Sequence, residues 1–299
     1  MTASALDPAV SVVVSTLDRP ALLARCLDAL LAGTRAPAEV VVVDQGDPAG
    51  VRQVLEARRG RGVELVHLVQ EGRGLSRSQN AGVAGASSAV VSVVDDDCVP
   101  DARWVEVAAR EHARAASPLL LTGRVLPLPA EGDRVRALSS RTSTVRVVLP
   151  PQAPPWQVGT GGNFSVDRAA YLHVGGNDVR LGTGTPGRAG NDLDLFRRLQ
   201  RAGVTTVYEP DLVVLHERAT VAEHRARRWT YGFGAGACVA LWRRQQDPRA
   251  LPLLRAWLRL RLDILRGDRT AATLVAESRV VLGTVAGLSY GWRQARREP

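Results

Sequence analysis

The first hundred residues alternate between short runs of β-branched residues and longer stretches in which leucine, valine and alanine recur at helical spacing. We predict strands over residues 10–14, 40–43, 63–69 and 90–94, and helices over residues 22–31, 51–59 and 75–86. Because these strands are apolar throughout, we expect a parallel sheet with helices on both faces. The pattern therefore predicts an α/β fold.

The second half of the chain is patterned less regularly. Prolines punctuate residues 117–156, which predicts loops and edge strands. A helix is predicted near 168–173 and another from Asn191, with a glycine-rich loop between them. Strands at 204–208 and 212–215 follow, and from about residue 222 the chain is expected to be helical and basic.

Polar residues follow the predicted strands at their carboxyl ends. Thr16 and Asp18 follow the first strand, Asp44 ends the second, and Asp95-Asp96-Asp97 follows the fourth. Ligands of parallel α/β sheets bind beyond the carboxyl ends of the strands. We therefore expect the binding site of this chain at that edge.

The three consecutive carboxylates repel one another unless a partner offsets the repulsion. A divalent cation such as Mg²⁺ or Mn²⁺ suits hard oxygen ligands. In a strand-like geometry Asp95 and Asp97 point the same way and Asp96 points opposite. The alternative to a metal site is that the three carboxylates lie in a loop after the strand and are simply hydrated.

Two further groups of residues are candidates for chemistry. Asn191, Asp192 and Asp194 begin a predicted helix, where capping alone explains such residues. Asp194 has Arg198 four residues on, an ordinary helix-surface pair, whereas Asp192 has no such partner and is the better candidate for a general base. His216 ends a predicted strand, and a lone histidine in that position is often structural.

Composition narrows the function classes. The 299 residues carry a net charge of +9, and every one of the 39 basic residues is arginine, so a P-loop nucleotidase, which needs a lysine, is disfavoured. The three cysteines are far apart and suggest neither disulfides nor a zinc site. Because no signal-peptide pattern opens the chain, we expect a cytoplasmic location. No uncharged apolar stretch reaches the length of a membrane span; the longest covers residues 280–292.

Six segments, taken in order, resemble family 2 glycosyltransferases. They comprise residues 12–19, 41–44, 74–82, 94–97 with Pro100, 161–163 and 190–195. Each motif is weak alone, but six in the right order are specific, and together they cover about residues 9–235. The resemblance implies a GT-A fold over residues 1–230, with a nucleotide half up to about residue 100, an acceptor half to 230, and a basic helical segment over 231–299.

The resemblance also implies an inverting, metal-dependent transfer from a nucleotide-diphosphate sugar to an acceptor hydroxyl, in which Asp192 is the base. The metal, Mn²⁺ or Mg²⁺, would be held by Asp95, Asp97 and His216. Asn191 and the Gly161-Gly162-Asn163 segment would lie on the side of the sugar and the acceptor. The expected nucleotide-sugar contacts are Thr16, Asp18, Arg19, Asp44, Arg77, Asn80, Asp95 and Asp96.

Two positions depart from the family pattern. Asn191 stands where an acidic residue is common, and Gln79 stands where a basic residue is common, so Arg73 or Arg77 would have to replace that charge.

Two other functions remain as alternatives. A Rossmann-type oxidoreductase is disfavoured because no G-x-G-x-x-G follows the first strand. Asp95, Asp97 and Asp192 together argue against a nucleotide-sugar-binding protein without activity.

The basic C-terminal segment has several interpretations. Arg225, Arg227 and Arg228 precede a glycine-rich aromatic stretch that resembles family members acting on lipid-linked or polysaccharide acceptors. Residues 251–262 mix large apolar residues with arginine. One interpretation is a helix packed on the main domain, and another is an interfacial helix at the inner face of an anionic membrane. No recognition motif supports nucleic-acid binding.

Overall fold

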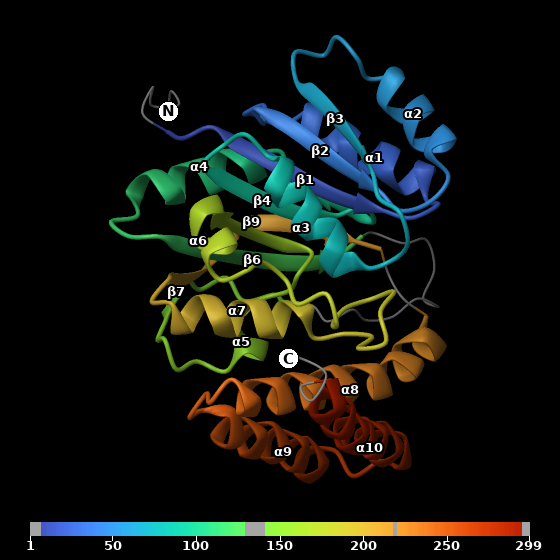
Figure 1. Cartoon of the computed structure of the whole chain (residues 1–299), viewed down its shortest axis with the longest axis vertical. Helices are drawn as coiled ribbons and strands as arrows, with labels where there is room; N and C mark the ends of the chain where they lie inside the picture. The colour runs from blue at the N-terminus through green and yellow to red at the C-terminus, as the bar shows by residue number, and fades with distance from the viewer. Residues whose placement is uncertain (1–6, 129–140, 218–219, 295–299) are drawn as a thin grey trace.

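The computed structural model describes residues 7–128, 141–217 and 220–294. Within these ranges a nine-stranded sheet forms the centre of the molecule, in the order β3-β2-β1-β4-β8-β6-β9-β5, with β7 paired to β9 (Figure 1). The first four strands are parallel, and their bounds lie close to the predicted ones: β1 (Val10–Thr16), β2 (Glu39–Asp44), β3 (Glu64–Val69) and β4 (Val90–Asp95).

Helices cover both faces of this sheet, as predicted. Alternate residues of β1 point to opposite sides: Val12 packs with α1 (Pro20–Leu31), α2 (Pro48–Glu56) and α4 (Trp104–Arg114), whereas Val13 packs with the helices of the other face. Those helices are α3 (Leu75–Gly85), α6 (Arg168–His173) and α7 (Asn191–Arg201).

Helix α4 was not predicted. Two polar residues, Glu111 and His112, lie on its buried side, which interrupts the apolar stripe that marks a core-facing helix. Both are partnered: Arg146 donates to Glu111, and the ring of His112 bonds Ser165. The helix therefore depends on tertiary partners that its own sequence does not reveal.

The second half of the sheet is mixed. It contains β5 (Cys98–Pro100), β6 (Leu119–Pro127), β7 (Val147–Leu149), β8 (Asn163–Asp167) and β9 (Thr205–His216). β6 and β9 are parallel, and the other pairings there are antiparallel. The expectation of two strands at 204–208 and 212–215 was wrong, because β9 continues through both. Its register against β6 shifts at Gly123, where a Cβ would lie 1.9 Å from the carbonyl oxygen of Leu212.

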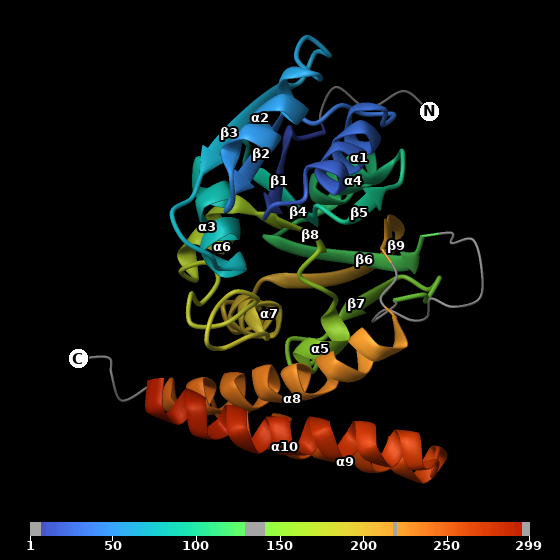
Figure 2. The same cartoon turned by 90° about the vertical axis from the view of Figure 1, so that its right-hand side faces the viewer.

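Three long helices form a separate layer below the sheet. They are α8 (Val221–Arg244), α9 (Ala250–Gly267) and α10 (Ala271–Gln294), and they lie beneath α7 and the short α5 (Pro155–Val158) (Figure 2). The expected helical C-terminal segment is thus present. Helix α8 runs without a break through residue 230, where the boundary between domains was predicted.

Helices α8 and α10 approach closely through glycines. A Cβ on Gly287 would lie 1.9 Å from the carbonyl oxygen of Phe233, and one on Gly236 would lie 2.0 Å from that of Thr284. Small residues let two helix backbones approach in this way. Glu277 of α10 is buried and pairs with Arg228 of α8 and Arg261 of α9, so one carboxylate ties the three helices together.

Within the described residues, α10 is the one helix whose length and composition would allow it to cross a membrane, with a mean hydropathy of 1.4. The sequence analysis found no such segment because it ended the apolar stretch at Arg279. The helix continues through Arg279 and Glu277, which lengthens it by more than two turns.

Candidate active site

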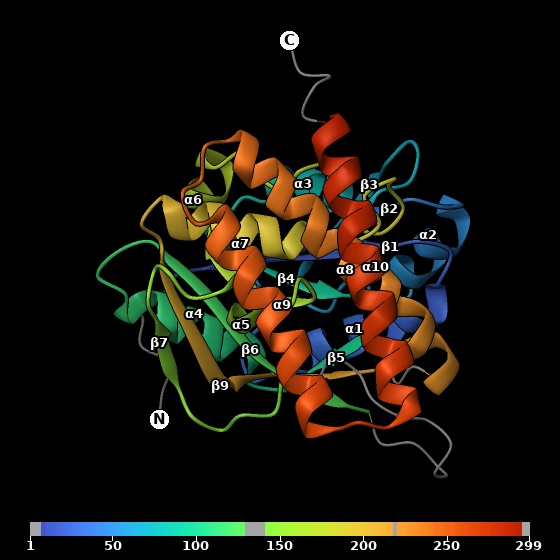
Figure 3. The ribbon, with the colours of Figure 1, turned by 90° about the horizontal axis from the view of Figure 1, so that it is seen from below.

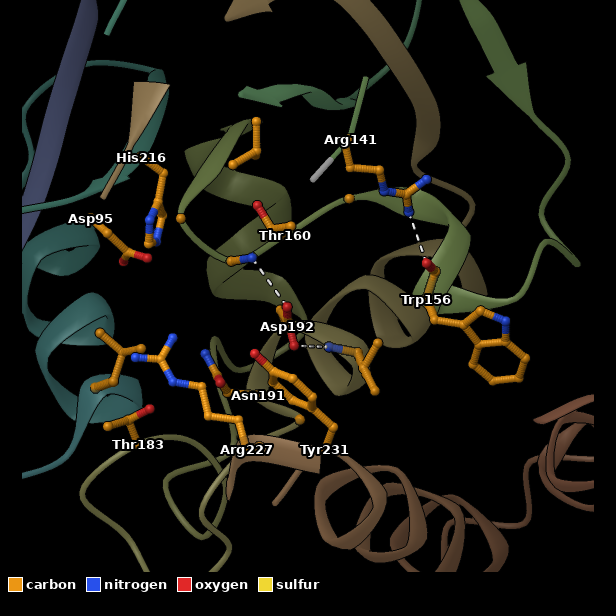
Figure 4. Close-up of a pocket in the computed structure, with 18 of the residues that line it drawn as sticks. Asp95, Arg141, Trp156, Thr160, Thr183, Asn191, Asp192, His216, Arg227 and Tyr231 are labelled. Carbon is orange, nitrogen blue, oxygen red and sulfur yellow. Dashed lines mark hydrogen bonds between the residues drawn. The ribbon is translucent and has the colours of Figure 1, made fainter. Parts of the chain in front are cut away.

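A cavity of about 550 Å³ opens between the carboxyl end of β4 and the helical layer (Figure 4). It gathers residues from many separate parts of the chain, and these include six of the predicted site residues: Asp95, Gly161, Gly162, Asn191, Asp192 and His216. Asp95, at the end of β4, and the proposed base Asp192 therefore share one cavity.

The three carboxylates of the acidic turn after β4 have different partners, and the predicted common direction of Asp95 and Asp97 is not seen, because Asp97 shares Arg19 with Asp96 while Asp95 lines the cavity. Asp96 is buried, accepts a 2.7 Å hydrogen bond from the Thr16 hydroxyl and pairs with Arg19. Asp97 also contacts Arg19, from which one of its oxygens lies 3.2 Å, and its other oxygen lies 3.5 Å from Nε2 of His216. Asp95 and His216 face the cavity together (Figure 4). We call Asp95, Asp97 and His216 the acidic wall.

Asp95 is held against a glycine. A Cβ on Gly162 would lie 2.2 Å from a carboxylate oxygen of Asp95, so the backbone of residue 162 approaches that carboxylate only because it is glycine. Burial raises the pKa of Asp95 to about 7, and the neighbouring charge of Asp97 adds to the rise. A cation at the acidic wall would favour the ionised carboxylate.

The donor atoms of the acidic wall fit a divalent metal ion. The Nδ1 atom of His216 lies 2.6 Å from the carbonyl oxygen of Glu217, so Nδ1 donates to that oxygen. This contact orients the ring so that Nε2 lies 3.5 Å from a carboxylate oxygen of Asp97. Asp97, Cys98 and His216 have ligand atoms within 4.8 Å of one another, of which the oxygen and the nitrogen suit Mn²⁺ or Mg²⁺.

Asp192 lies across the cavity at the start of α7. Gly190, with φ of 87°, turns the chain into this helix. One carboxylate oxygen of Asp192 accepts the Gly161 N–H at 3.1 Å, and the other accepts the Leu193 N–H at 2.8 Å. Burial raises the pKa of Asp192, and the two backbone hydrogen bonds oppose that rise. The carboxylate is thus fixed and retains lone pairs for a substrate hydroxyl.

Asp194 has the structural role predicted for it. Its carboxylate pairs with Arg198 one turn along α7, and its other oxygen accepts the indole N–H of Trp242 at 2.9 Å. Asp194 is buried away from the cavity and attaches α7 to α8. As expected, Asp192 faces the cavity, whereas Asp194 is paired within the protein.

Most of the predicted nucleotide contacts lie outside this cavity. Asp44 is buried and accepts a hydrogen bond from the Gly46 N–H, and His67 lies 3.2 Å from its second oxygen. Asp18 accepts a hydrogen bond from the Asp47 N–H, and Arg77 is exposed on α3. With Thr16 and Arg19 they lie near the carboxyl ends of β1 and β2, and their contacts with a nucleotide stay predictions.

Two predicted binding residues, Asn80 and Asn163, make hydrogen bonds within the fold, and their contacts with substrates stay predictions. The Asn80 side chain bonds the Tyr171 hydroxyl and both the N–H and the carbonyl of Asn177. Asn163 is buried, accepts from the Trp104 indole and donates to two carbonyl oxygens. Neither side chain lines the cavity, because these hydrogen bonds hold it within the protein interior.

Gln79, the residue that departs from the family pattern, has a positioning role. It is buried, and its amide donates to the Gly161 carbonyl at 3.2 Å while accepting from Asn177. Because the Gly161 N–H bonds Asp192, the Gln79 amide supports the loop that holds the candidate base.

The sequence analysis missed most of the opposite side of the cavity. It is lined by arginine and aromatic side chains, which we call the basic wall: Arg141, Trp156, Arg227, Arg228, Tyr231, Trp257 and Arg261. Arg227 reaches into the cavity from α8, and Arg141 donates to the Trp156 carbonyl (Figure 4). The arginines before Trp229 were noted in the sequence, but no local signal linked them to Arg141 or Trp257.

Known proteins resemble the chain in sequence. Residues 11–151 match the model of glycosyl transferase family 2. The glucosyl-dolichyl phosphate glucuronosyltransferase of Haloferax volcanii is 26% identical over 189 residues, 58% of this chain and 57% of that protein. The pre-mycofactocin glycosyltransferase of Mycobacterium tuberculosis is 28% identical over 250 residues, 79% of this chain and 50% of that protein. The chain thus spans little more than half the length of these relatives.

Solved structures share the fold. The mannosyltransferase PcManGT from Pyrobaculum calidifontis, in complex with GDP-Man and Mn²⁺, superposes with a TM-score of 0.60 at 20% identity, covering 99% of this chain and 82% of that one. GalNAc-T7 with UDP, GalNAc and Mn²⁺ gives 0.59 at 14% identity, covering 78% of this chain and 51% of that one. The expected GT-A fold is confirmed. The residues that match the model of glycosyl transferase family 2 thus include the strand-end motifs at 12–19, 41–44 and 94–97, through which the chain resembles that family.

Proposed function

We propose that this protein transfers a sugar from a nucleotide-diphosphate sugar to an acceptor hydroxyl, with inversion at the anomeric carbon. One observation carries the proposal: Asp192 lines the same cavity as Asp95 and His216. The nucleotide sugar GDP-Man in one structural neighbour, and the nucleotide UDP together with the sugar GalNAc in the other, support this class of sugar donor.

Asp192 would act as the base. The acceptor hydroxyl gives its proton to a carboxylate oxygen of Asp192 while its own oxygen forms a bond to the anomeric carbon. The bond from that carbon to the diphosphate oxygen breaks, and the electron pair leaves with the nucleoside diphosphate. Such a single displacement needs one base and no second nucleophile, and it inverts the configuration.

Asp95, Asp97 and His216 would hold a divalent metal ion at the leaving-group side. When bound, Mn²⁺ or Mg²⁺ would supply a Lewis acid that offsets the charge developing on the diphosphate. The neighbours' Mn²⁺ supports this assignment. Gly162 allows the chain to pass directly against Asp95, which fixes the position of that carboxylate at the cavity.

The acceptor would reach Asp192 along the basic wall. Trp257 lies under the Arg261 guanidinium, 4.2 Å from ring centroid to the central guanidinium carbon, and Trp156 packs edge-on against Trp257. Trp257 therefore supports this wall from within, and the partly exposed rings of Trp156 and Tyr231, which line the cavity, suit sugar rings and other apolar surfaces. Lipid-linked, polysaccharide and small-molecule acceptors all carry a suitable hydroxyl.

Calorimetry and a nucleotide-release assay test the proposal. The protein is titrated with UDP-, GDP- and dTDP-sugars, with Mn²⁺ and with EDTA, and release of nucleoside diphosphate is followed with water as the surrogate acceptor. We expect one sugar donor to bind more tightly with Mn²⁺ and to be turned over. Tight binding with no turnover for any sugar donor or added sugar acceptor would make the protein a nucleotide-sugar-binding protein instead.

A further inference from the structure

The outer surface of the helical layer carries most of the exposed large apolar side chains. Fifteen such side chains are exposed in the described part of the chain, and nine of them lie on α9 and α10. We call these nine the outer apolar face: Leu251, Leu258, Leu262, Leu274, Val275, Val281, Leu282, Val285 and Trp292. Contiguous apolar surface of this kind marks interaction sites in soluble proteins.

Helical spacing places these residues on stripes directed away from the protein. Leu251, Leu258 and Leu262 are separated by seven and four residues, which aligns them along one side of α9. On α10 the main stripe has the same kind of spacing, in the order Leu274, Val281, Val285 and Trp292. Both helices are outermost in the molecule, as the view from below shows (Figure 3).

The surroundings of the outer apolar face are basic. Arg255 and Arg259 are exposed on α9 beside Leu258 and Leu262, and Arg279 and Arg293 are exposed on α10. Asp263 is the exposed acid within the described span of these two helices, and it pairs with Arg266. Apolar stripes bordered by arginine are complementary to anionic phospholipid headgroups above an acyl-chain region.

A peripheral position suits α10 better than a membrane-spanning one. Glu277 is buried between Arg228 and Arg261, and Gly283 and Gly287 pack on the backbone of α8. Crossing a bilayer would break these contacts and place a carboxylate in hydrocarbon. A second copy of the chain is also disfavoured, because a symmetric contact would bring the arginines of both copies together.

We propose that the outer apolar face docks on the surface of an anionic phospholipid bilayer. The opposite sides of the same helices line the cavity through Trp257, Arg261 and Val280. Docking would therefore hold the basic wall beside the bilayer. The proposal does not depend on transfer activity, because bilayer binding needs no sugar donor.

Flotation of the full chain with vesicles tests the proposal. We expect the protein to float with vesicles of phosphatidylcholine and phosphatidylglycerol at low salt, and to bind pure phosphatidylcholine or high-salt samples at least tenfold less. The double substitution Leu262→Asp/Val285→Asp should reduce binding at least about tenfold. Val69→Asp/Leu172→Asp, at two exposed apolar positions elsewhere, is the matched control and should bind like the wild type.

A charge variant covers the case in which the apolar variant fails to fold. Arg255→Glu/Arg259→Glu should weaken binding, whereas Arg52→Glu/Arg59→Glu on the far side of the molecule should not. Melting curves confirm that each variant is folded. Absence of wild-type binding to anionic vesicles, or equal binding by the face variants, would overturn the proposal. A dimer that the face variants dissociate, without vesicle binding, would assign the face to a second copy.

Discussion

The two walls of the cavity are built in different ways. The acidic wall takes Asp95 and Asp97 from one turn and His216 from the strand paired beside it, and of these three residues Asp95 and His216 line the cavity. The basic wall draws Arg141, Arg227 and Trp257 from a loop and two separate helices. The first is therefore complete once the sheet has formed, whereas the second exists only when the helical layer packs against the sheet domain.

This difference suits a reaction with two substrates. In the proposed function the acidic wall would hold a metal and a diphosphate, whereas the basic wall carries aromatic and guanidinium side chains. Asp192 lies between them, supported from the sheet side by Gln79 through Gly161. We expect damage to the acidic wall to affect binding of the sugar donor, and damage to the helical layer to affect stability and acceptor use.

The largest effect should come from Asp192. Asp192→Asn keeps the shape of the side chain but removes the base, so nucleotide release should fall about 10²- to 10⁴-fold while sugar-donor affinity is retained. Turnover and calorimetry on one preparation check this. Asp194→Asn is the control, since Asp194 bonds Arg198 and Trp242 and should affect stability instead. Unchanged turnover in Asp192→Asn would remove the base assignment.

The pH dependence should follow the same residue. Burial raises the pKa of Asp192 above 3.8, so the carboxyl binds a proton more tightly in the folded protein. Turnover should fall about tenfold per pH unit below that raised pKa, because the base is then protonated. The same shift favours folding below the unfolded pKa, and that contribution is lost as the pH rises through the folded value. An acid limb of the turnover profile that lies at or below the ordinary pKa of an aspartate would contradict the prediction.

Asp97→Asn should weaken the acidic wall. The oxygen facing His216 would lose its charge, so Mn²⁺-dependent binding of the sugar donor should weaken about 10- to 100-fold, with little effect on binding in EDTA. Calorimetry with and without metal measures both values. Equal losses in the two conditions would mean that Asp97 acts through Arg19 and the fold rather than through a metal.

Substitutions where α8 and α10 pack together should lower the stability of the protein. Gly287→Ala places a Cβ against the Phe233 carbonyl oxygen and should lower the free energy of unfolding by about 1–3 kcal/mol. Gly267→Ala is the control, because nothing lies within 4 Å of the added Cβ and alanine favours a helix. Chemical denaturation measures both. Equal stability of the two variants would mean that α8 and α10 are less closely packed than described.

The smallest effect should come from Gln79, whose amide holds the loop that bonds Asp192. Gln79→Met fills similar volume but removes the hydrogen bond to the Gly161 carbonyl, which should cost about 0.5–1.5 kcal/mol. Turnover should fall roughly threefold to tenfold with unchanged sugar-donor affinity and a shifted pH profile. Loss of sugar-donor affinity instead would show that Gln79 contacts the nucleotide, as its place in the family pattern suggests.

Sequence reasoning succeeded where the signal is local. The apolar strands, the alternation of Asp95 and Asp96, and the pairing of Asp194 with Arg198 each involve residues a few positions apart. It did not find α4, whose buried Glu111 depends on Arg146, or the continuity of β9, which depends on Gly123 of another strand. The basic wall was missed for the same reason, since its residues meet only in the folded chain.

The central claim is that the acidic wall binds the metal and the diphosphate while Asp192 faces the sugar. A crystal structure with Mn²⁺ and a nucleoside diphosphate tests it most directly through the anomalous signal of manganese. We predict one manganese peak between Asp97 and His216, with the terminal phosphate on the side of the cavity that faces Asp192. A peak elsewhere, or a nucleotide bound away from Asp95, would contradict the account.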